Sequence, residues 1–395
     1  MRVNKIEFIS FRNIENEVIE FDDGINVIYG ENAQGKTNIL EGIYLFARGK
    51  SFRAFKDKEL VSFDSNIAYA KMEFEARDEK TLLGAEISRT QSKKFYRNNV
   101  KVNKTSEIIG DFRAVLFCPS HLGIIKDAPA VRRKFIDVAI SQLRPVYLKM
   151  MTRYNQVLDE RNTIIKMNPD ERKANEALID IYSEELASLC ADIADIRNEY
   201  IKKLDYWVKI FFSEMTDGRE EPKITYESNG NESDFSEREA LKQRYLHLLT
   251  DYKEREYKFG ATLFGIHKDD LKIEINGRDS RLYSSQGQQR SLALAMKMAE
   301  GEISRESKGE YPVFLFDDVL SELDETRKKY ILSNIKSRQV IITACEKSVF
   351  ENSDGCHFIN IKDGKKRDIL SESTLPDNSY EVSGEINEKT PETEL

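Results

Sequence analysis

Residues 30–37, Gly-Glu-Asn-Ala-Gln-Gly-Lys-Thr, have the types and spacing needed to wrap a phosphate chain. The apolar run Ile25–Tyr29 predicts a strand entering this loop, and a helix is expected from about Thr37. Backbone N–H groups and a helix N-terminus attract anions. Lys36 would reach the β- and γ-phosphates, and the Thr37 hydroxyl would ligate Mg²⁺. The sequence therefore predicts an ATP site whose residues are Gly30, Glu31, Asn32, Ala33, Gln34, Gly35, Lys36 and Thr37.

A second element, residues 311–318 (Tyr-Pro-Val-Phe-Leu-Phe-Asp-Asp), reads as a buried strand that ends in two acids. Burying a carboxylate is costly unless it is paired or binds a metal. Mg²⁺ beside the phosphate loop supplies such a reason. We expect Asp317 to hold the metal and Asp318 to orient or deprotonate the attacking water, with Lys36 as the third catalytic residue. Taken alone, the acids could also form a solvated turn.

Between these elements lies a helix start that is a second candidate anion site, led by Ser285 with Gly287 and Gln288. The P-loop of the same chain already covers its own phosphate. We therefore expect this element to contact a γ-phosphate that is held by another subunit. By itself the motif is equally compatible with an ordinary serine helix cap.

The elements that must position these residues fall into three parts. Strand patterns occupy the first third, at Val3–Phe8, Val18–Phe21, Ile67–Glu75 and Leu82–Ile87, and they return at Leu271–Ile275, Val313–Phe316 and Val340–Thr343. Between them, residues 146–166 read as a helix, Asn168 and Pro169 as a cap and first turn, and 178–211 as a second helix. We expect these helices to form an antiparallel hairpin in a bundle, rather than a long extended coil.

This pattern predicts an α/β fold with a helical insertion. Residues 1–125 and 259–370 would form the ATPase domain, and 126–258 the insertion, with 216–240 as a loop. Residues 371–395 contain seven acids and one base, so they carry −6 of the net charge of −8, and we expect them to be disordered. The remaining body is nearly neutral, which leaves room for a local basic face.

The composition also bears on location. No stretch approaches the ~20 consecutive apolar residues that a membrane span needs, so we expect no membrane association. The N-terminus reads as an alternating strand and not as a signal peptide. The four cysteines form no CxxC pair, which implies neither a disulfide framework nor a zinc site. We expect a cytoplasmic protein.

Together, the P-loop (Walker A), the serine-led helix (a degenerate signature) and the acidic strand (Walker B) resemble an ABC-type ATPase, with Ser321 and Asp324 where that class has its D-loop. More closely, the chain resembles the RecF family of bacterial DNA-repair ATPases, which are related to SMC proteins. The resemblance is carried by residues 11–13, 30–44, 49–53, 115–122, 132–137, 265–271, 285–295 and 316–324.

The resemblance implies an SMC-like head domain built from the N- and C-terminal segments. It implies an ATPase that converts ATP and water to ADP and phosphate, forms an ATP-dependent homodimer and binds gapped DNA. RecF-like proteins act with RecO and RecR to place RecA at single-strand gaps, and they support the SOS response. By resemblance, Arg12 and Arg53 are candidates for phosphate contacts, although each could equally be a surface or salt-bridging arginine. His267 could lie near the signature face or be a hydrogen-bonded structural histidine.

Two departures from the wider ABC pattern predict slow hydrolysis. Residues 118–121 (Cys-Pro-Ser-His) occupy the region where a Q-loop glutamine is expected, and Ala344-Cys345 follows the strand Val340–Thr343 without a switch histidine. Incomplete polarisation of the γ-phosphate would favour a timer or clamp over a high-turnover engine.

Candidate DNA contacts are the cations of a predicted hairpin with interleaved aromatics: Lys93, Lys94, Arg97, Lys101 and Lys104. The alternative is a solvated hairpin whose aromatics face the core. Arg132 and Arg133, at the start of the insertion, could contact DNA or form a solvated helix start.

Three other classes remain as alternatives. SMC or break-repair ATPases carry long coiled arms, transporter subunits lack the helical insertion, and a nucleotide sensor would show little hydrolysis.

Overall fold

The computed structural model describes residues 1–228, 231–232, 237–320, 323–335, 338–347, 350 and 355–367. The predicted disordered tail, 371–395, and Ser321 lie outside these residues. Within them, no helix has the length and apolar character required to cross a bilayer.

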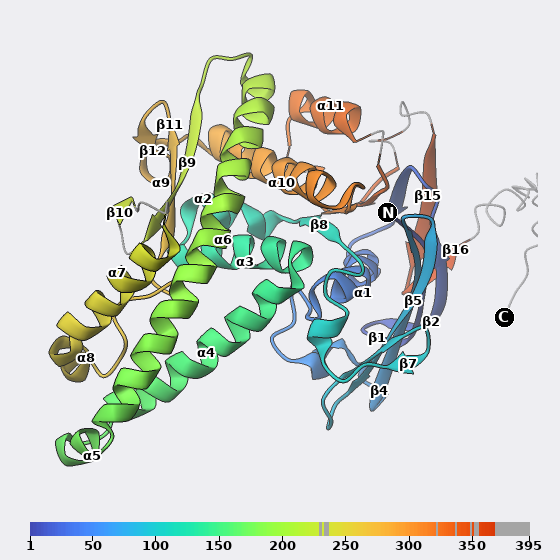
Figure 1. Cartoon of the computed structure of the whole chain (residues 1–395). Helices are drawn as coiled ribbons and strands as arrows, with labels where there is room; N and C mark the ends of the chain where they lie inside the picture. Colours follow the sequence, from blue (N-terminus) through green and yellow to red (C-terminus); the bar gives the residue numbers. More distant parts are fainter. Residues whose placement is uncertain are drawn as a thin grey trace, which may run out of the picture.

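An antiparallel sheet forms the first layer (Figure 1), in the order β2-β1-β4-β5-β6-β7. Its inner face is apolar because every second residue of each strand points into the core, as Ile6 and Phe8 do on β1. The strands are β1 (Arg2–Phe11), β2 (Ile14–Glu20), β4 (Ile67–Ala76), β5 (Glu79–Ser88), β6 (Lys94–Arg97) and β7 (Val100–Lys101).

A second sheet, in the order β16-β15-β3-β14-β13-β8, shares a hydrophobic core with the first. It is parallel except for the β15–β16 hairpin. Its strands are β3 (Ile25–Tyr29), β8 (Ala114–Phe117), β13 (Val313–Asp317), β14 (Val340–Ala344), β15 (Cys356–Lys362) and β16 (Lys365–Arg367). β8, β13 and β14 are almost entirely apolar because both faces of this sheet are covered.

Helix α1 (Lys36–Arg48) packs in the core between the two sheets. The opposite face of the parallel sheet is covered by α3 (Pro129–Leu143) and α10 (Gln286–Lys308). The helix that leaves the P-loop and the helix that begins at the signature therefore lie on opposite faces of one sheet.

The predicted helical hairpin is confirmed. Helix α4 (Pro145–Ile165) packs against α6 (Glu176–Thr216), and the two meet at α5 (Pro169–Ala174), as Figure 1 shows. Asn168 caps α5 through its side chain, which accepts from the N–H of Glu171 at 3.0 Å, and Pro169 is the first helical residue. The remaining helices are α2 (Gly123–Lys126), α7 (Arg238–Asp251), α8 (Lys253–Phe259), α9 (Ser280–Tyr283) and α11 (Glu325–Asn334).

The prediction of a loop at 216–240 is wrong for residues 222–228, which form β9 (Pro222–Ser228). β9 lies in a sheet of order β10-β9-β11-β12, with β10 (Asn231–Glu232), β11 (Asp270–Ile275) and β12 (Arg278–Asp279). Its apolar residues alternate with polar ones that face outward, so a polar composition concealed the strand. β9 pairs with β11, so the boundary predicted at 258/259 is bridged by a shared sheet, and the insertion is not purely helical.

A buried ion pair fastens the insertion to the segment that precedes the signature, and a second one lies within the insertion. Arg132 donates to both carboxylate oxygens of Asp270, at 2.7 and 2.8 Å. Within the insertion, Arg161 of α4 and Glu256 of α8, both fully buried, pair at 2.7 Å. Removing one partner of such a pair leaves an uncompensated charge in the interior. The first pair therefore fixes α3 on β11, and the second fixes α4 on α8.

His267 belongs to the same buried region. Its Nε2 lies 3.2 Å from the carbonyl oxygen of Thr262, and its Nδ1 lies 2.6 Å from the Tyr154 hydroxyl. A neutral ring that donates from Nε2 and accepts at Nδ1 satisfies both contacts. Burial lowers the pKa of His267 to about 4. His267 is therefore the hydrogen-bonded structural histidine of the two readings.

This arrangement predicts an acid-sensitive fold. The unfolded chain protonates His267 near pH 6.5, whereas the folded chain does so only near pH 4. As the pH falls through this window, protons bind the unfolded state preferentially, and stability falls. The wild type should lose at most about 3 kcal/mol relative to His267→Gln between pH 7 and pH 4. Urea unfolding of both proteins across that range measures the difference, and parallel pH profiles would contradict it.

Candidate nucleotide-binding site

The P-loop lies between the end of β3 and the start of α1, as predicted. Gly30 and Gly35 have φ angles of 150° and 109°, in the region that favours glycine. A Cβ on Gly30 would collide with the carbonyl oxygen of Ile361, and one on Gly35 would lie 2.8 Å from the Asn13 side-chain oxygen. Both glycines are therefore required by the close packing around the loop.

Lys36 is buried and bends back across the loop. Its Nζ donates to the carbonyl oxygens of Gly30 and Glu31, at 2.5 and 2.7 Å. This places a positive charge at the mouth of the loop, beside the N-terminus of α1. A phosphate chain in the loop would meet the ammonium group and the helix N-terminus together.

The C-terminal hairpin holds the P-loop from outside. The N–H of Gly364 donates to the Gln34 carbonyl oxygen at 3.0 Å, and the N–H of Asp363 donates to the Gln34 side chain. A Cβ on Gly364 would collide with the backbone of Asn13. The sequence analysis missed this support, because no motif links the β15–β16 turn to a loop more than 300 residues earlier.

The two predicted halves of a metal site meet at Asp317. Its Oδ1 accepts hydrogen bonds from the Thr37 hydroxyl at 2.7 Å and from the Thr343 hydroxyl at 3.1 Å. Burial raises the pKa of Asp317, while the hydrogen bonds from Thr37 and Thr343 and the charge of Arg53 oppose that rise. Asp318 follows with a φ of 52°, and its N–H donates to Thr343 at 2.9 Å.

The donor set suits Mg²⁺. This ion prefers oxygen ligands and usually binds proteins through one or two of them, leaving the other positions to water and phosphate. The Thr37 hydroxyl and the Asp317 carboxylate provide two such oxygens at the P-loop. In the described part of the chain, no cluster of three or more His, Cys, Asp or Glu residues offers a different metal site.

Arg12 and Arg53 differ sharply. Arg12 donates to both carboxylate oxygens of Glu41, at 2.9 and 2.8 Å, and Glu41 is fully buried on α1 and also accepts from Ser51. Arg12 is therefore a salt-bridging arginine. Arg53 is exposed and lies close enough to Asp317 to lower its pKa. Of the two, Arg53 remains the candidate for a phosphate contact.

The signature forms the predicted helix start. Ser285 is exposed and caps α10, accepting from the Gln288 N–H at 3.2 Å, while its own N–H donates to the Gln288 side chain at 2.7 Å. Arg327 donates to the Gly287 carbonyl oxygen at 3.1 Å. Among the described residues, no hydrogen bond or ion pair joins Ser285, Gly287 or Gln288 to the P-loop of the same chain.

Asp324 caps α11, accepting from the N–H of Arg327 at 2.9 Å, and also pairs with the Arg327 side chain. Because Arg327 also reaches Gly287, the D-loop aspartate and the signature are connected through one arginine. The other D-loop residue, Ser321, is outside the described residues.

The predicted DNA-contacting cations are mostly paired. Lys93 lies 2.8 Å from Asp57, Lys94 lies 2.6 Å from Glu86, and Arg97 lies 2.7 Å from Asp111. The hairpin Lys94–Lys101 is present, but Phe95 is buried against the core, as the alternative reading had it. Lys101 and Lys104 are exposed.

At the start of the insertion, a DNA contact by Arg132 is no longer expected, because its buried guanidinium is taken up by Asp270 and the carbonyl oxygen of Asp127. Arg133 is only half-buried, and it donates to the Asp269 carbonyl oxygen at 2.7 Å.

The regions of the two departures from the ABC pattern lie at the carboxyl ends of β8 and β14. His121 stacks on Phe117, and its pKa is lowered well below the usual value by burial and by the charges of Lys297, Lys134 and Arg48. Cys345 lies at the end of β14, with its Sγ 3.1 Å from the side-chain oxygen of Asn32 in the P-loop. The switch position is thus occupied by a thiol that contacts the loop.

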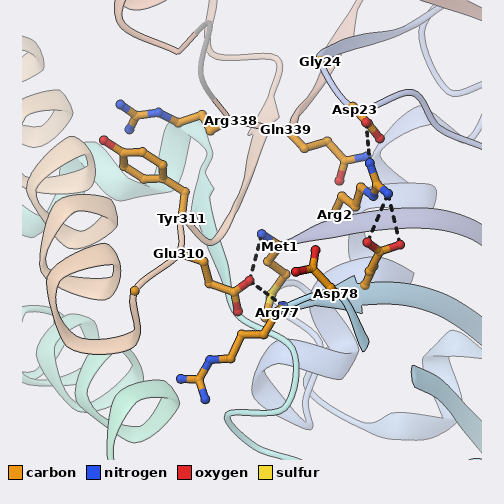
Figure 2. A pocket seen from close by; sticks show the side chains of 12 residues that line it. Met1, Arg2, Asp23, Gly24, Arg77, Asp78, Glu310, Tyr311, Arg338 and Gln339 are labelled. Atoms are coloured by element: carbon orange, nitrogen blue, oxygen red, sulfur yellow. Dashed lines mark hydrogen bonds and ion pairs between the residues drawn. The ribbon is translucent and has the colours of Figure 1, made fainter. Parts of the chain in front are cut away.

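A cavity of about 680 Å³ opens at the amino ends of the parallel strands, where β13 and β14 begin. Figure 2 shows Arg2 reaching Asp23 and a second carboxylate across this cavity. Arg2 lies 3.1 Å from Glu75, and Glu310 lies 3.2 Å from the N-terminal ammonium group of Met1. These lining charges neutralise one another, and the P-loop lies at the opposite, carboxyl ends of the strands. This cavity is therefore not the candidate site.

The Arg12–Glu41 pair predicts a folding defect. In Arg12→Ala, the buried Glu41 carboxylate loses its cation, and the free energy of unfolding should fall by about 3 kcal/mol. Arg53→Ala is the matched control, because its exposed side chain should change stability by less than about 0.5 kcal/mol. Denaturant unfolding compares the two. Equal stability of both variants would contradict a structural role for Arg12.

Residues 2–367 match the family model described as the RecF/RecN/SMC N terminal domain. The DNA replication and repair protein RecF of Clostridium beijerinckii is 40% identical over 343 residues, covering 87% of this chain and 91% of that protein. The RecF protein of Geobacillus thermodenitrificans is 35% identical over 377 residues, covering 95% of this chain and 97% of that protein.

Two solved structures of the recombination mediator protein RecF, described as RecF-ATPrS and RecF-ATP, match with TM-scores of 0.87 and 0.84 at 38% and 37% identity. Each match covers 93% of this chain and 98% of the other. An Smc head domain from Pyrococcus furiosus, at 17% identity and a TM-score of 0.53 over 92% of this chain and 95% of its own, shares the fold. The predicted α/β SMC-like head is confirmed, and the chain belongs to the RecF family.

Proposed function

We propose that this protein is an ATP-dependent, dimerising, DNA-binding ATPase of gap repair. The observation that carries the proposal is the hydrogen bond of 2.7 Å between Thr37 and Asp317, two residues 280 positions apart. It brings the phosphate loop and the acidic strand together as a nucleotide site that binds ATP with Mg²⁺. The RecF-ATP and RecF-ATPrS forms of the related structures support this assignment.

Hydrolysis at this site is an attack by water on the γ-phosphate. Lys36 stabilises the negative charge that spreads over the phosphate oxygens, and the backbone N–H groups of the loop hold the phosphates in line. Asp318 orients the water and accepts its proton. Thr37 and Asp317 would hold Mg²⁺, which would supply charge neutralisation for the phosphate chain.

The position of the signature supports a dimer. Ser285 is exposed at the N-terminus of a 23-residue helix, and that end of the helix attracts anions. Since no hydrogen bond or ion pair joins it to its own P-loop in the part of the chain that the structure describes, it can cover the γ-phosphate held by a second copy. A two-fold axis then gives two equal composite sites, each with a P-loop from one subunit and a signature from the other.

DNA is the proposed partner of this dimer, with RecO- and RecR-like mediators as protein partners. The names of the relatives, DNA replication and repair proteins and a recombination mediator of the RecFOR pathway, support both. In that role the protein would help to load the recombinase at single-strand gaps and support the SOS response. We place it in the cytoplasm, where ATP and chromosomal DNA are present.

Long coiled arms do not fit this chain. Helix α6 returns along α4, and β9 rejoins the C-terminal segment through β11, so the insertion closes on the head. The thiol at the switch position, in place of a histidine, is consistent with slow turnover.

The cross-subunit role predicts separable defects. Ser285→Arg should leave ATP affinity within about threefold of wild type, because its own P-loop is intact, but it should abolish nucleotide-dependent dimers. Lys36→Ala should lose ATP binding itself. Nucleotide titration and analytical ultracentrifugation measure the two properties. A Ser285→Arg protein that still dimerises with ATP would refute the proposed contact.

The DNA-binding role is tested by measuring affinity for gapped DNA with and without ATP and Mg²⁺ at several salt concentrations. The slope of log K against log salt counts phosphate contacts, at about −0.9 per contact on duplex DNA. We expect ATP to increase the affinity of wild type and to have no effect on Lys36→Ala. Equal affinity of wild type with and without nucleotide would exclude a nucleotide-controlled clamp.

A further inference from the structure

Thr343 occupies the junction between the two halves of the nucleotide site. It lies near the carboxyl end of β14, where its backbone pairs with Ile28 of β3 on one side and Asp317 of β13 on the other. β3 leads into the P-loop and β13 ends in the acidic pair. The side chain is only 2% exposed, so its hydroxyl must find its partners within the protein.

The hydroxyl makes two hydrogen bonds that a single Oγ–H can satisfy together, and the carbonyl oxygen of Phe316 lies 3.5 Å from it as a longer, alternative acceptor. It accepts from the backbone N–H of Asp318 at 2.9 Å, and its proton is donated to Asp317 Oδ1 at 3.1 Å. Asp317 Oδ1 also accepts from Thr37 at 2.7 Å. One threonine therefore contacts both acids of the site, the first through its carboxylate and the second through its backbone.

The contact with Asp318 matters because of the backbone there. A φ of 52° places Asp318 in the left-handed region, which a non-glycine residue rarely adopts and which the surroundings must hold in place. The bond from its N–H to Thr343 is one such restraint. The direction in which the Asp318 side chain leaves the strand end depends on this backbone conformation.

We propose that Thr343 is a positioning residue for ATP hydrolysis, which fixes the Asp317 carboxylate for the metal and the Asp318 backbone for the attacking water. This rests on the proposed function. Thr343 contacts the acids and touches no reacting atom, so it acts through them. It stands two residues before Cys345, on the strand whose end lacks the switch histidine of ABC-type ATPases.

Two variants separate the hydroxyl from the shape of the side chain. Thr343→Val keeps the branched shape and removes both hydrogen bonds, whereas Thr343→Ser keeps the hydroxyl and removes one methyl group. The matched control is Thr225→Val on β9, because the buried Thr225 hydroxyl has no hydrogen-bond partner and lies outside the nucleotide site.

Steady-state ATP hydrolysis is measured for the full-length proteins over a range of Mg²⁺ concentrations, with ATP affinity measured by titration and folding by thermal melting. We expect Thr343→Val to lower kcat about 10- to 100-fold and to raise the Mg²⁺ concentration for half-maximal rate, as removal of a residue behind a metal ligand does. ATP affinity should stay within about threefold, because the loop and Lys36 are unchanged. Thr343→Ser should recover most of kcat, and Thr225→Val should match wild type.

The outcomes distinguish this proposal from the proposed function. If wild type hydrolyses ATP and Thr343→Val does so at the same rate and with the same Mg²⁺ dependence, the positioning role is refuted while the ATPase assignment stands. A Thr343→Ser protein as impaired as Thr343→Val would assign the effect to packing and would also refute it. If wild type shows no hydrolysis, the proposed function itself fails. Should Thr343→Val melt early, Thr343→Ser alone still decides, since near-wild-type kcat supports the role and a 10-fold loss opposes it.

Discussion

The hydrogen bond between Thr37 and Asp317 is the contact on which the candidate nucleotide site depends. It joins the first turn of α1 to the end of β13, and it can form only if β3, β14 and β13 lie side by side in register. The parallel sheet fixes that register, because covered faces and continuous apolar strands admit little slippage. Both hydrophobic cores, one on each side of this sheet, therefore serve to hold two oxygens at hydrogen-bonding distance.

A buried ion pair, Arg132 with Asp270, adds to the apolar contact that fastens the insertion to the head. Inside the insertion, Arg161 with Glu256 is a second buried pair, and the geometry of both pairs tolerates little displacement. Asp270, the partner of Arg132, is the first residue of β11, and the chain then passes through β12 and α9 to Ser285. The orientation of the signature helix α10 therefore depends on how the insertion docks on β11.

Local chemistry was readable from the sequence, whereas side-chain pairing across the chain was not. The strand Ile25–Tyr29, the cap Asn168 and the signature cap Ser285 are each determined by neighbours within a few residues, and each was predicted correctly. Arg132 looked like a surface cation because its partner lies 138 residues away, and the strand Pro222–Ser228 looked like a loop because only its pairing with β11 reveals the buried face. No local sequence pattern indicates the hydrogen bond from the Gly364 N–H to the Gln34 carbonyl oxygen.

The contact between the β15–β16 turn and the P-loop has a consequence for folding during translation. The P-loop emerges from the ribosome early, but the strands and the turn that complete its surroundings, β13, β14 and the β15–β16 hairpin, are translated last. Domains generally fold as units, so a nascent chain of this protein has the P-loop but lacks β13, β14 and the β15–β16 hairpin until synthesis is nearly finished. The residues that surround the phosphate loop in the folded protein are therefore all present only when translation is almost complete.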